Sequence, residues 1–206
     1  MRGLRVCLSI VRAVSFSPAT SRAAPCRALR GCRPMTLLDE VVGLLAADAI
    51  PHALIGAAAL AVRGIARSTF DIDLLTTDRR VFAPERWAPL VRAGATVDIR
   101  HGDAEDPLAG VIRITSAGAR PVDVIVGRHA WQGRAVARAE PGVDAPPVVT
   151  AVDLVLLKLY AGGTQDLWDV RELLRGTDAE ALIDAVDREL RTLPTAMRAA
   201  WSTARA

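Results

Sequence analysis

GAAALAVRGIARSTFDIDLL, residues 56–75, is the stretch that decides the predicted fold. It follows an apolar segment, 52–55, that is typical of a short buried strand. Gly56 then opens a run of small residues that is typical of a helix, and Gly64 closes it. Residues 69–75 alternate between apolar and acidic side chains, as a second strand does. This strand–helix–strand order predicts an α/β fold.

Two carboxylates project from the second strand. Asp71 and Asp73 stand two residues apart, so their side chains point to the same face. Such close carboxylates repel each other unless a cation lies between them. Oxygen ligands of this kind suit Mg²⁺, with Mn²⁺ as a possible substitute. The structural alternative is an edge strand whose solvated face happens to be acidic.

A third carboxylate, Asp123, lies mid-strand between Val122 and Val124, where an unpaired charge is costly. Its strand, 121–126, is expected to pair with the strand 111–115 around a Ser-Ala-Gly turn. If Asp123 faces the first two carboxylates, the three would complete a two-metal site, with ions about 3.5–4 Å apart.

The other elements place these strands in an α/β core, residues 35–148, followed by a helical portion, residues 149–206. Thr36 is expected to cap the first helix, and Thr150 with Asp153 is expected to form a capping box on a later one. The expected helices cover 37–49, 57–64, 87–92, 150–162, 164–175 and a segment after 178, and a further strand covers 96–100.

Residues 1–34 differ from the rest, because they hold seven Arg, no acidic residue and all three cysteines. We interpret them as a disordered basic leader or the result of a translation start assigned too early, with Met35 as the natural start. A transit peptide or a basic arm for nucleic acid is the alternative. The remaining chain has a net charge of −4 and no cysteine, which excludes a Cys-based zinc site and suits the cytoplasm. No apolar run approaches 18 residues, so no membrane span is expected.

Lys158 is the single lysine among 26 basic residues. It lies at the border of the apolar stripe of its helix, from which it can reach a cleft while contributing little to the core. Because arginine tolerates most surface roles equally well, this lysine suggests a role for a compact point charge. Chance in codon usage is the alternative.

These residues resemble a known family. The run 56–75 is similar to the signature of the nucleotidyltransferase superfamily, which has Gly-Gly or Gly-Ser, a short helix, and Asp-x-Asp. The Arg67/Thr69 pair and DLVLLKLYAGGTQDLWDVRELL, residues 153–174, resemble the AbiEii/AbiGii-type toxin nucleotidyltransferases. The resemblance spans roughly residues 50–175. It implies a minimal nucleotidyltransferase fold, which is a mixed sheet flanked by helices.

The resemblance also implies residue roles. Asp71 and Asp73 would bind the metal, and Asp123 would complete the site and help to deprotonate the attacking hydroxyl. Lys158 would contact phosphates, and Gly56 would let the backbone approach the triphosphate. The other residues in matching positions are Ala57, Arg67 and Thr69 near the nucleotide, and Asp166 and Asp169 after the lysine.

Two of these positions leave alternatives open. Ala57 replaces the usual Gly or Ser, which removes a possible phosphate contact. Arg67 could bind a phosphate or pair with an acid.

The implied reaction moves a nucleotide from an NTP such as ATP to an acceptor hydroxyl and releases pyrophosphate. The leading interpretation is a toxin-like enzyme with an antitoxin partner that acts on RNA or protein. A second interpretation is an aminoglycoside nucleotidyltransferase, for which the acidic stretch Asp103, Glu105 and Asp106 could bind a polycation. A third is a degenerate domain that binds a nucleotide or a partner chain, which Ala57 favours.

Overall fold

The computed structural model describes residues 35–142, 145–176 and 178–206, and residues 35–206 form one compact unit. The predictions for residues 1–34 lie outside the described residues.

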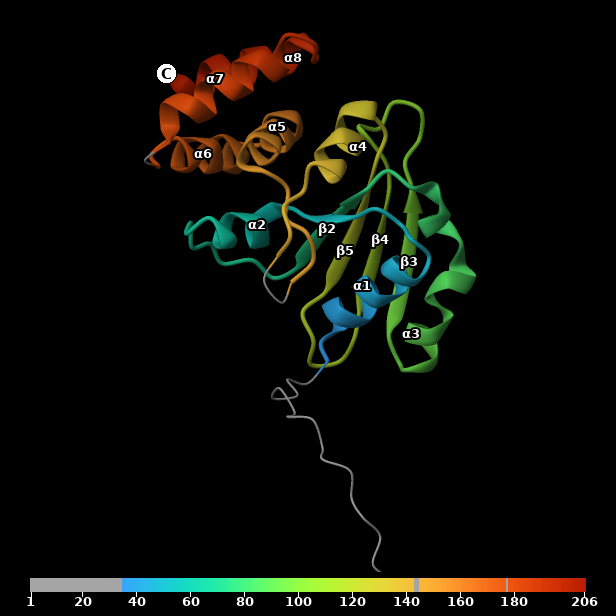
Figure 1. The fold of residues 1–206 in the computed structure, drawn as a ribbon. Coiled ribbons are helices and arrows are strands. Elements are labelled where there is room, and N and C mark those ends of the chain that lie inside the picture. The colour runs from blue at the N-terminus through green and yellow to red at the C-terminus, as the bar shows by residue number, and fades with distance from the viewer. Residues whose placement is uncertain (1–34, 143–144, 177) are drawn as a thin grey trace, which may run out of the picture. The chain divides into compact units, whose positions relative to one another are not determined.

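A five-stranded mixed sheet forms the centre of the unit (Figure 1). Its strands are β1 (Ala53–Leu54), β2 (Ile72–Thr76), β3 (Thr96–His101), β4 (Leu108–Thr115) and β5 (Val122–Gly127), in the order β1-β2-β5-β4-β3. The β2·β5 pair is parallel and the other pairs are antiparallel. The predicted α/β class with a mixed sheet is therefore confirmed, and the antiparallel pairing of the two strands around the Ser-Ala-Gly turn is also confirmed.

The helices flank and follow the sheet. They are α1 (Leu37–Ala47), α2 (Gly56–Val62), α3 (Ala88–Arg92), α4 (Ala130–Ala137), α5 (Ala151–Ala161), α6 (Thr164–Leu173), α7 (Ala179–Leu190) and α8 (Thr195–Arg205), with short 3-10 helices at Arg79–Phe82 and Pro84–Trp87. Helices α5 to α8 pack on one another as the helical C-terminal portion (Figure 1). No helix in the described ranges is both long and apolar enough to cross a membrane.

Local capping explains several helix ends. Thr36 and Asp39 form the capping box of α1, and Gly162 ends α5 in the left-handed conformation, with φ of 69°. The Thr150 hydroxyl accepts the N–H of Asp153, as predicted. The predicted capping box is not completed, however, because the Asp153 carboxylate is buried and accepts hydrogen bonds from the Arg138 guanidinium and the Thr150 hydroxyl instead.

Helix α4 has no counterpart among the predicted elements. Its apolar residues are mostly alanine, and the run 132–134 interrupts them, so the helical period is weak. A local contact fixes its start, because the buried Gln132 side chain accepts the backbone N–H groups of Arg128 and His129 at 2.8 and 2.9 Å.

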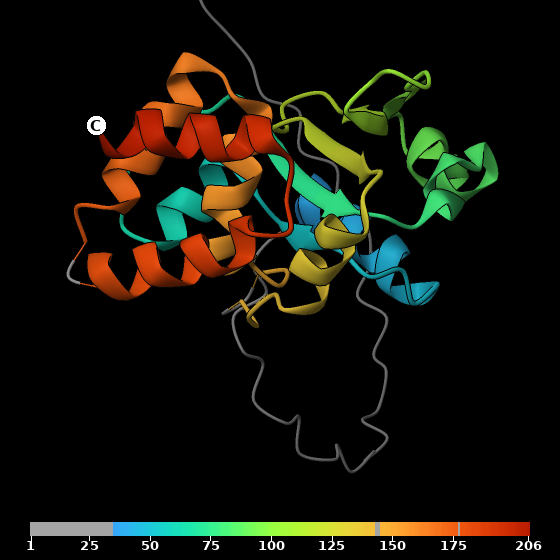
Figure 2. The same ribbon diagram turned by 90° about the horizontal axis from the view of Figure 1, so that it is seen from above.

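The two faces of the sheet differ in chemistry. One face is apolar and fully buried, and it includes Leu74, Ile112, Ile114, Val122 and Val124. Helix α1 packs against this sheet through β5, and Figures 1 and 2 show α1 and α3 beside the strands. Because side chains alternate along a strand, the residues between these apolar ones face the other way. That second face carries the charged residues described next.

Candidate functional site

The register of the sheet brings the predicted carboxylates onto one face. In the parallel β2·β5 pair, Asp73 lies directly opposite Asp123. Asp71 comes one residue before β2 begins, in line with Asp73 on the same side. The charge of Asp71 acts on both of the other carboxylates. A single face of the strand pair therefore presents all three.

Asp73 is the most perturbed of the three. Burial, together with the neighbouring charges of Asp71 and Asp123, raises the pKa of Asp73 to about 6. The charge of Lys158 acts in the opposite direction, which places that lysine near the same site. No hydrogen bond or ion pair reaches the Asp73 carboxylate from the residues that the structure describes. A half-buried carboxylate without a partner is able to accept a cation.

Gly56 is required by Asp73. A β-carbon at position 56 would lie 2.1 Å from Oδ2 of Asp73, and Gly56 has a φ of +63° that favours glycine. The resemblance assigns this glycine to the approach of a triphosphate. The structure gives a second reason for it, since the space beside Gly56 holds the carboxylate of Asp73.

Asp123 is paired with a residue that the sequence analysis did not single out. Nη1 of Arg113 lies 2.8 Å from Oδ2 of Asp123, and Nη2 of Arg113 lies 3.6 Å from Oδ2 of Asp71. Burial raises the pKa of Asp123 against the opposing effect of Arg113. The other oxygen, Oδ1, is buried without a hydrogen-bond partner among the described residues.

The signal that identified Asp123 also identifies Arg113 in retrospect. Arg113 lies mid-strand between Ile112 and Ile114, as Asp123 does between two valines. In the antiparallel β4·β5 pair the two residues are directly opposite. A charge among apolar strand residues therefore indicated a partner on the neighbouring strand.

Asp71 is held from its own loop. The Thr69 hydroxyl donates to Asp71, lying 3.0 Å from Oδ1 and 3.1 Å from the backbone carbonyl oxygen. Arg120 donates to the backbone carbonyls of Thr69 and Asp71. In this structure Thr69 orients a carboxylate, whereas the resemblance places it near the nucleotide.

Lys158 lies in a network of charges between α5 and α6. Its Nζ atom is 2.8 Å from Oδ1 of Asp166 and 2.7 Å from Oδ2 of Asp169, which is fully buried. Arg67 forms an ion pair with the same Asp169 oxygen. Of the two roles left open for Arg67, the structure shows pairing with an acid. Asp169 thus connects the loop before β2 to the C-terminal helices.

The donor set suits a magnesium or manganese ion only in part. Throughout the described residues, no three acidic, histidine or cysteine side chains form a cluster that could hold an ion by themselves. Carboxylate oxygens are nevertheless the ligands that Mg²⁺ prefers, and Mg²⁺ is often bound by one or two carboxylates plus substrate phosphates. The unpaired Asp73 carboxylate and the partnerless Oδ1 of Asp123 fit such a shared ion.

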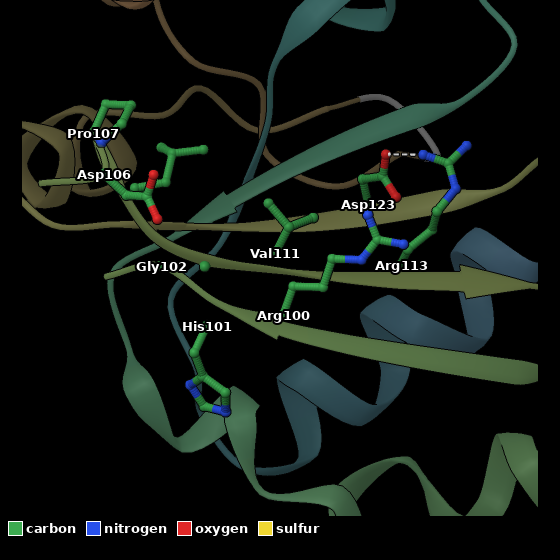
Figure 3. Close-up of a pocket in the computed structure, with 10 residues that line it drawn as sticks. Arg100, His101, Gly102, Asp106, Pro107, Val111, Arg113 and Asp123 are labelled. Carbon is green, nitrogen blue, oxygen red and sulfur yellow. Dashed lines mark hydrogen bonds and ion pairs between the residues drawn. The ribbon is translucent and has the colours of Figure 1, made fainter. Parts of the chain in front are cut away.

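A cavity of about 340 Å³ opens beside Asp123. Figure 3 shows that Arg100 and Arg113 extend toward Asp123, whereas His101 points away and Asp106 lies at the other end beside Pro107. The cavity is large enough for part of an acceptor molecule next to a candidate base.

The acidic stretch only partly lines this cavity. Asp106 contributes to its wall, but Asp103 and Glu105 do not. The Asp106 carboxylate accepts the N–H of Asp103, and the Asp103 carboxylate accepts the N–H groups of Glu105 and Asp106. These acids therefore shape their own loop, and two arginines balance the acidic residues around the cavity.

No family model matches the chain, and no curated protein matches it significantly. Solved structures do. ANT(2″)-Ia, an aminoglycoside nucleotidyltransferase in complex with adenylyl-2″-tobramycin, matches with a TM-score of 0.51 at 17% identity, over 80% of this chain and 97% of that one. The chain has the nucleotidyltransferase fold.

Two further structures are similar at lower scores. The solution structure of the antibiotic-resistance factor ANT(2″)-Ia has a TM-score of 0.48 at 14% identity, over 72% of this chain and 86% of that chain. Terminal uridylyl transferase 4 from Trypanosoma brucei with bound GTP has a TM-score of 0.31 at 15% identity, over 66% of this chain and 47% of that chain.

Proposed function

We propose that this protein is a metal-dependent nucleotidyltransferase that moves a nucleotide from an NTP to an acceptor hydroxyl and releases pyrophosphate. The observation that carries the proposal is the direct opposition of Asp73 and Asp123, with Asp71 beside them, on the charged face of a nucleotidyltransferase fold. Burial and close like charges of this kind, which together raise the pKa of Asp73, are typical of sites where a cation or a reaction requires them.

Asp71 and Asp73 would hold Mg²⁺, or Mn²⁺ in its place, together with the phosphates of the NTP. The bound ion would neutralise charge on the triphosphate and favour ionisation of the acceptor hydroxyl. Thr69 keeps Asp71 in orientation, and Gly56 leaves room for Asp73. These contacts fix the positions from which catalysis by charge neutralisation proceeds.

Asp123 would act as the base toward the acceptor. Its Oδ2 accepts from Arg113, so Oδ1 is left to accept the hydrogen of a hydroxyl that enters through the adjoining cavity. The pKa of Asp123 is raised by burial, which makes its carboxylate more basic, as suits a general base. Lys158 would supply positive charge near the phosphates, and Asp169 would position Lys158 and Arg67.

For the acceptor, we favour a toxin-like role in the cytoplasm, in which RNA or protein is modified and an antitoxin partner controls the activity. The AbiEii-type features at Arg67, Thr69 and 153–174 support this choice. So does the cavity, because Arg100 and Arg113 in its wall oppose the entry of a polycation.

Nucleotide transfer to an aminoglycoside is the second candidate. It is supported by the similarity in fold to ANT(2″)-Ia, a match that covers 97% of the ANT(2″)-Ia chain. Asp106 in the cavity wall also supports it. A degenerate domain that binds a nucleotide or a partner is the third candidate, supported by the buried Ala57.

One assay separates these candidates. The full chain is incubated with each α-labelled NTP and Mg²⁺, in parallel with total RNA, cell protein or tobramycin, and both label transfer and pyrophosphate are measured. We expect label on RNA or protein, and loss of transfer in Asp71→Asn and Asp123→Asn. Asp98→Asn, on the same face of β3, is the control and should keep activity. Label on tobramycin alone would select the second candidate, and NTP binding without pyrophosphate release would select the third.

A further inference from the structure

Arg113 occupies the position between two of the three carboxylates. Its guanidinium nitrogens lie 2.8 Å from Oδ2 of Asp123 and 3.6 Å from Oδ2 of Asp71. The placement is built into the backbone, because Arg113 and Asp123 are directly opposite in the β4·β5 register and Asp123 is directly opposite Asp73 in the β2·β5 register. A positive charge therefore lies on the carboxylate cluster without any metal.

The remaining oxygens show what space is left for metal. The Asp73 carboxylate receives no hydrogen bond or ion pair from the described residues, and Oδ1 of Asp123 is also without a partner there. Oδ1 of Asp71 accepts only from the Thr69 hydroxyl, which leaves it a lone pair. Among the described residues, the Asp73 carboxylate and Oδ1 of Asp123 are thus without a partner, whereas Oδ2 of Asp123 and Oδ2 of Asp71 are paired with Arg113.

Charge balance leads to the same division. Three carboxylates and one guanidinium carry a formal charge of −2, which one divalent ion balances. Lys158 is already paired with Asp166 and Asp169, so it does not alter this balance by a full charge.

We propose that Arg113 takes the place of one of the two divalent ions that the sequence led us to expect beside these carboxylates, so that this chain binds a single metal ion, at Asp73. This inference rests on the proposed function and deepens it. The metal ion is shared with the triphosphate. Arg113 is a positioning residue that pairs with Asp123 and Asp71 and so prevents a second ion from binding to them.

Counting bound manganese tests the proposal without any activity assay. The full chain is titrated with Mn²⁺ alone at pH 8. Free Mn²⁺ is measured from its electron paramagnetic resonance signal. The wild type should bind one ion with an isolated-manganese spectrum. Arg113→Met should bind two, with the exchange-coupled spectrum of neighbouring ions.

Three variants control the count. Arg100→Met removes a guanidinium from the adjoining strand, one that lines the same cavity without contacting the carboxylates, and should leave one ion. Arg113→Lys keeps the charge and should also leave one ion. Asp73→Asn removes the proposed ligand and sets the background of nonspecific binding, which is subtracted.

Each result decides the question. Two ions on the wild type, or one ion on a folded Arg113→Met, overturns the role of Arg113 while leaving the proposed function standing. No specific ion on any protein also overturns the inference, whereas the proposed function is judged separately by the labelled-NTP assay. The number of ions on the wild type alone can overturn the inference, so the inference can be tested even if Arg113→Met does not fold.

Discussion

Nζ of Lys158 on α5 lies 2.7 Å from Oδ2 of Asp169 on α6, and the Asp169 side chain is completely buried. The same carboxylate is the partner of Arg67, from the loop that leads into β2. A single buried acid thus connects the loop before the candidate site to the helical portion. The charge of Lys158 also acts on Asp73, one of the three carboxylates of the site.

Lys158→Ala should therefore affect both catalysis and stability. Turnover should fall by on the order of 10²–10³, as for other removed electrostatic stabilisers. The sequence alone suggested an unchanged melting temperature. The pairing with buried Asp169 changes that expectation, since the substitution leaves Arg67 as its only cationic partner among the described residues and should cost about 1–3 kcal/mol.

Lys158→Arg is the matched variant for this test. It should recover most of the stability and only part of the turnover, because a planar guanidinium cannot occupy the same point position. Thermal melts beside the transfer assay measure the two effects. Full activity and an unchanged melt in Lys158→Ala would show that the network matters for neither.

Asp73 should make the stability depend on pH. Its pKa is about 6 in the folded chain and near 3.8 when unperturbed, so the folded chain binds more protons between these values. Stability should therefore fall as the pH rises from about 4 to 6 and remain lowered above that range. Asp73→Asn should be more stable than the wild type by roughly 1–3 kcal/mol at pH 8, with the difference vanishing near pH 4.

Denaturant unfolding at several pH values measures this difference. Asp98→Asn is the control, because this acid on β3 forms an exposed ion pair with Arg100, and its replacement should show no comparable gain. Added Mn²⁺ should stabilise the wild type above pH 6 and not Asp73→Asn. A less stable Asp73→Asn at pH 8 would contradict the expected repulsion.

Gly56→Ala should disrupt the site through Asp73. The new β-carbon would lie 2.1 Å from Oδ2 of Asp73, at a backbone φ of +63°. Gly64→Ala provides the comparison, because Gly64 has a φ of +80° and nothing within 4 Å of the added carbon. Backbone strain alone should cost Gly64→Ala about 1 kcal/mol. Gly56→Ala should cost more and should lose transfer activity, as unfolding curves and the labelled-NTP assay would show; equal effects would exclude the clash.

Arg138→Ala should be strongly destabilising. Asp153 is fully buried, and Arg138 Nη2 lies 2.5 Å from its Oδ1. Removal of the guanidinium leaves a buried charge without its cation, which typically costs about 3–5 kcal/mol. The matched control is Arg175→Ala, whose ion pair with Glu172 is exposed on the arginine side and should be worth less than about 1 kcal/mol. Similar melting temperatures for the two variants would contradict a stabilising role of the Arg138–Asp153 pair.

Much of the fold was readable from local pattern. The period-2 alternation around Asp73 predicted a strand, and Thr36 as the N-cap marked a helix start at Leu37, which the structure confirms. These features depend on neighbours within a few residues, so a sequence carries them directly. Helix α4 was missed because its apolar period is weak and its start depends on the contacts of the Gln132 side chain.

The sequence by itself determined the α/β class, the three candidate carboxylates and the unusual status of Lys158. Only the tertiary structure decided that Arg113 bridges Asp123 and Asp71 and that Asp169 joins Lys158 to Arg67. The physical reason is that ion pairs across strands and between helices depend on register and packing. Those are set by the burial of the whole apolar face, and no local run of residues encodes them.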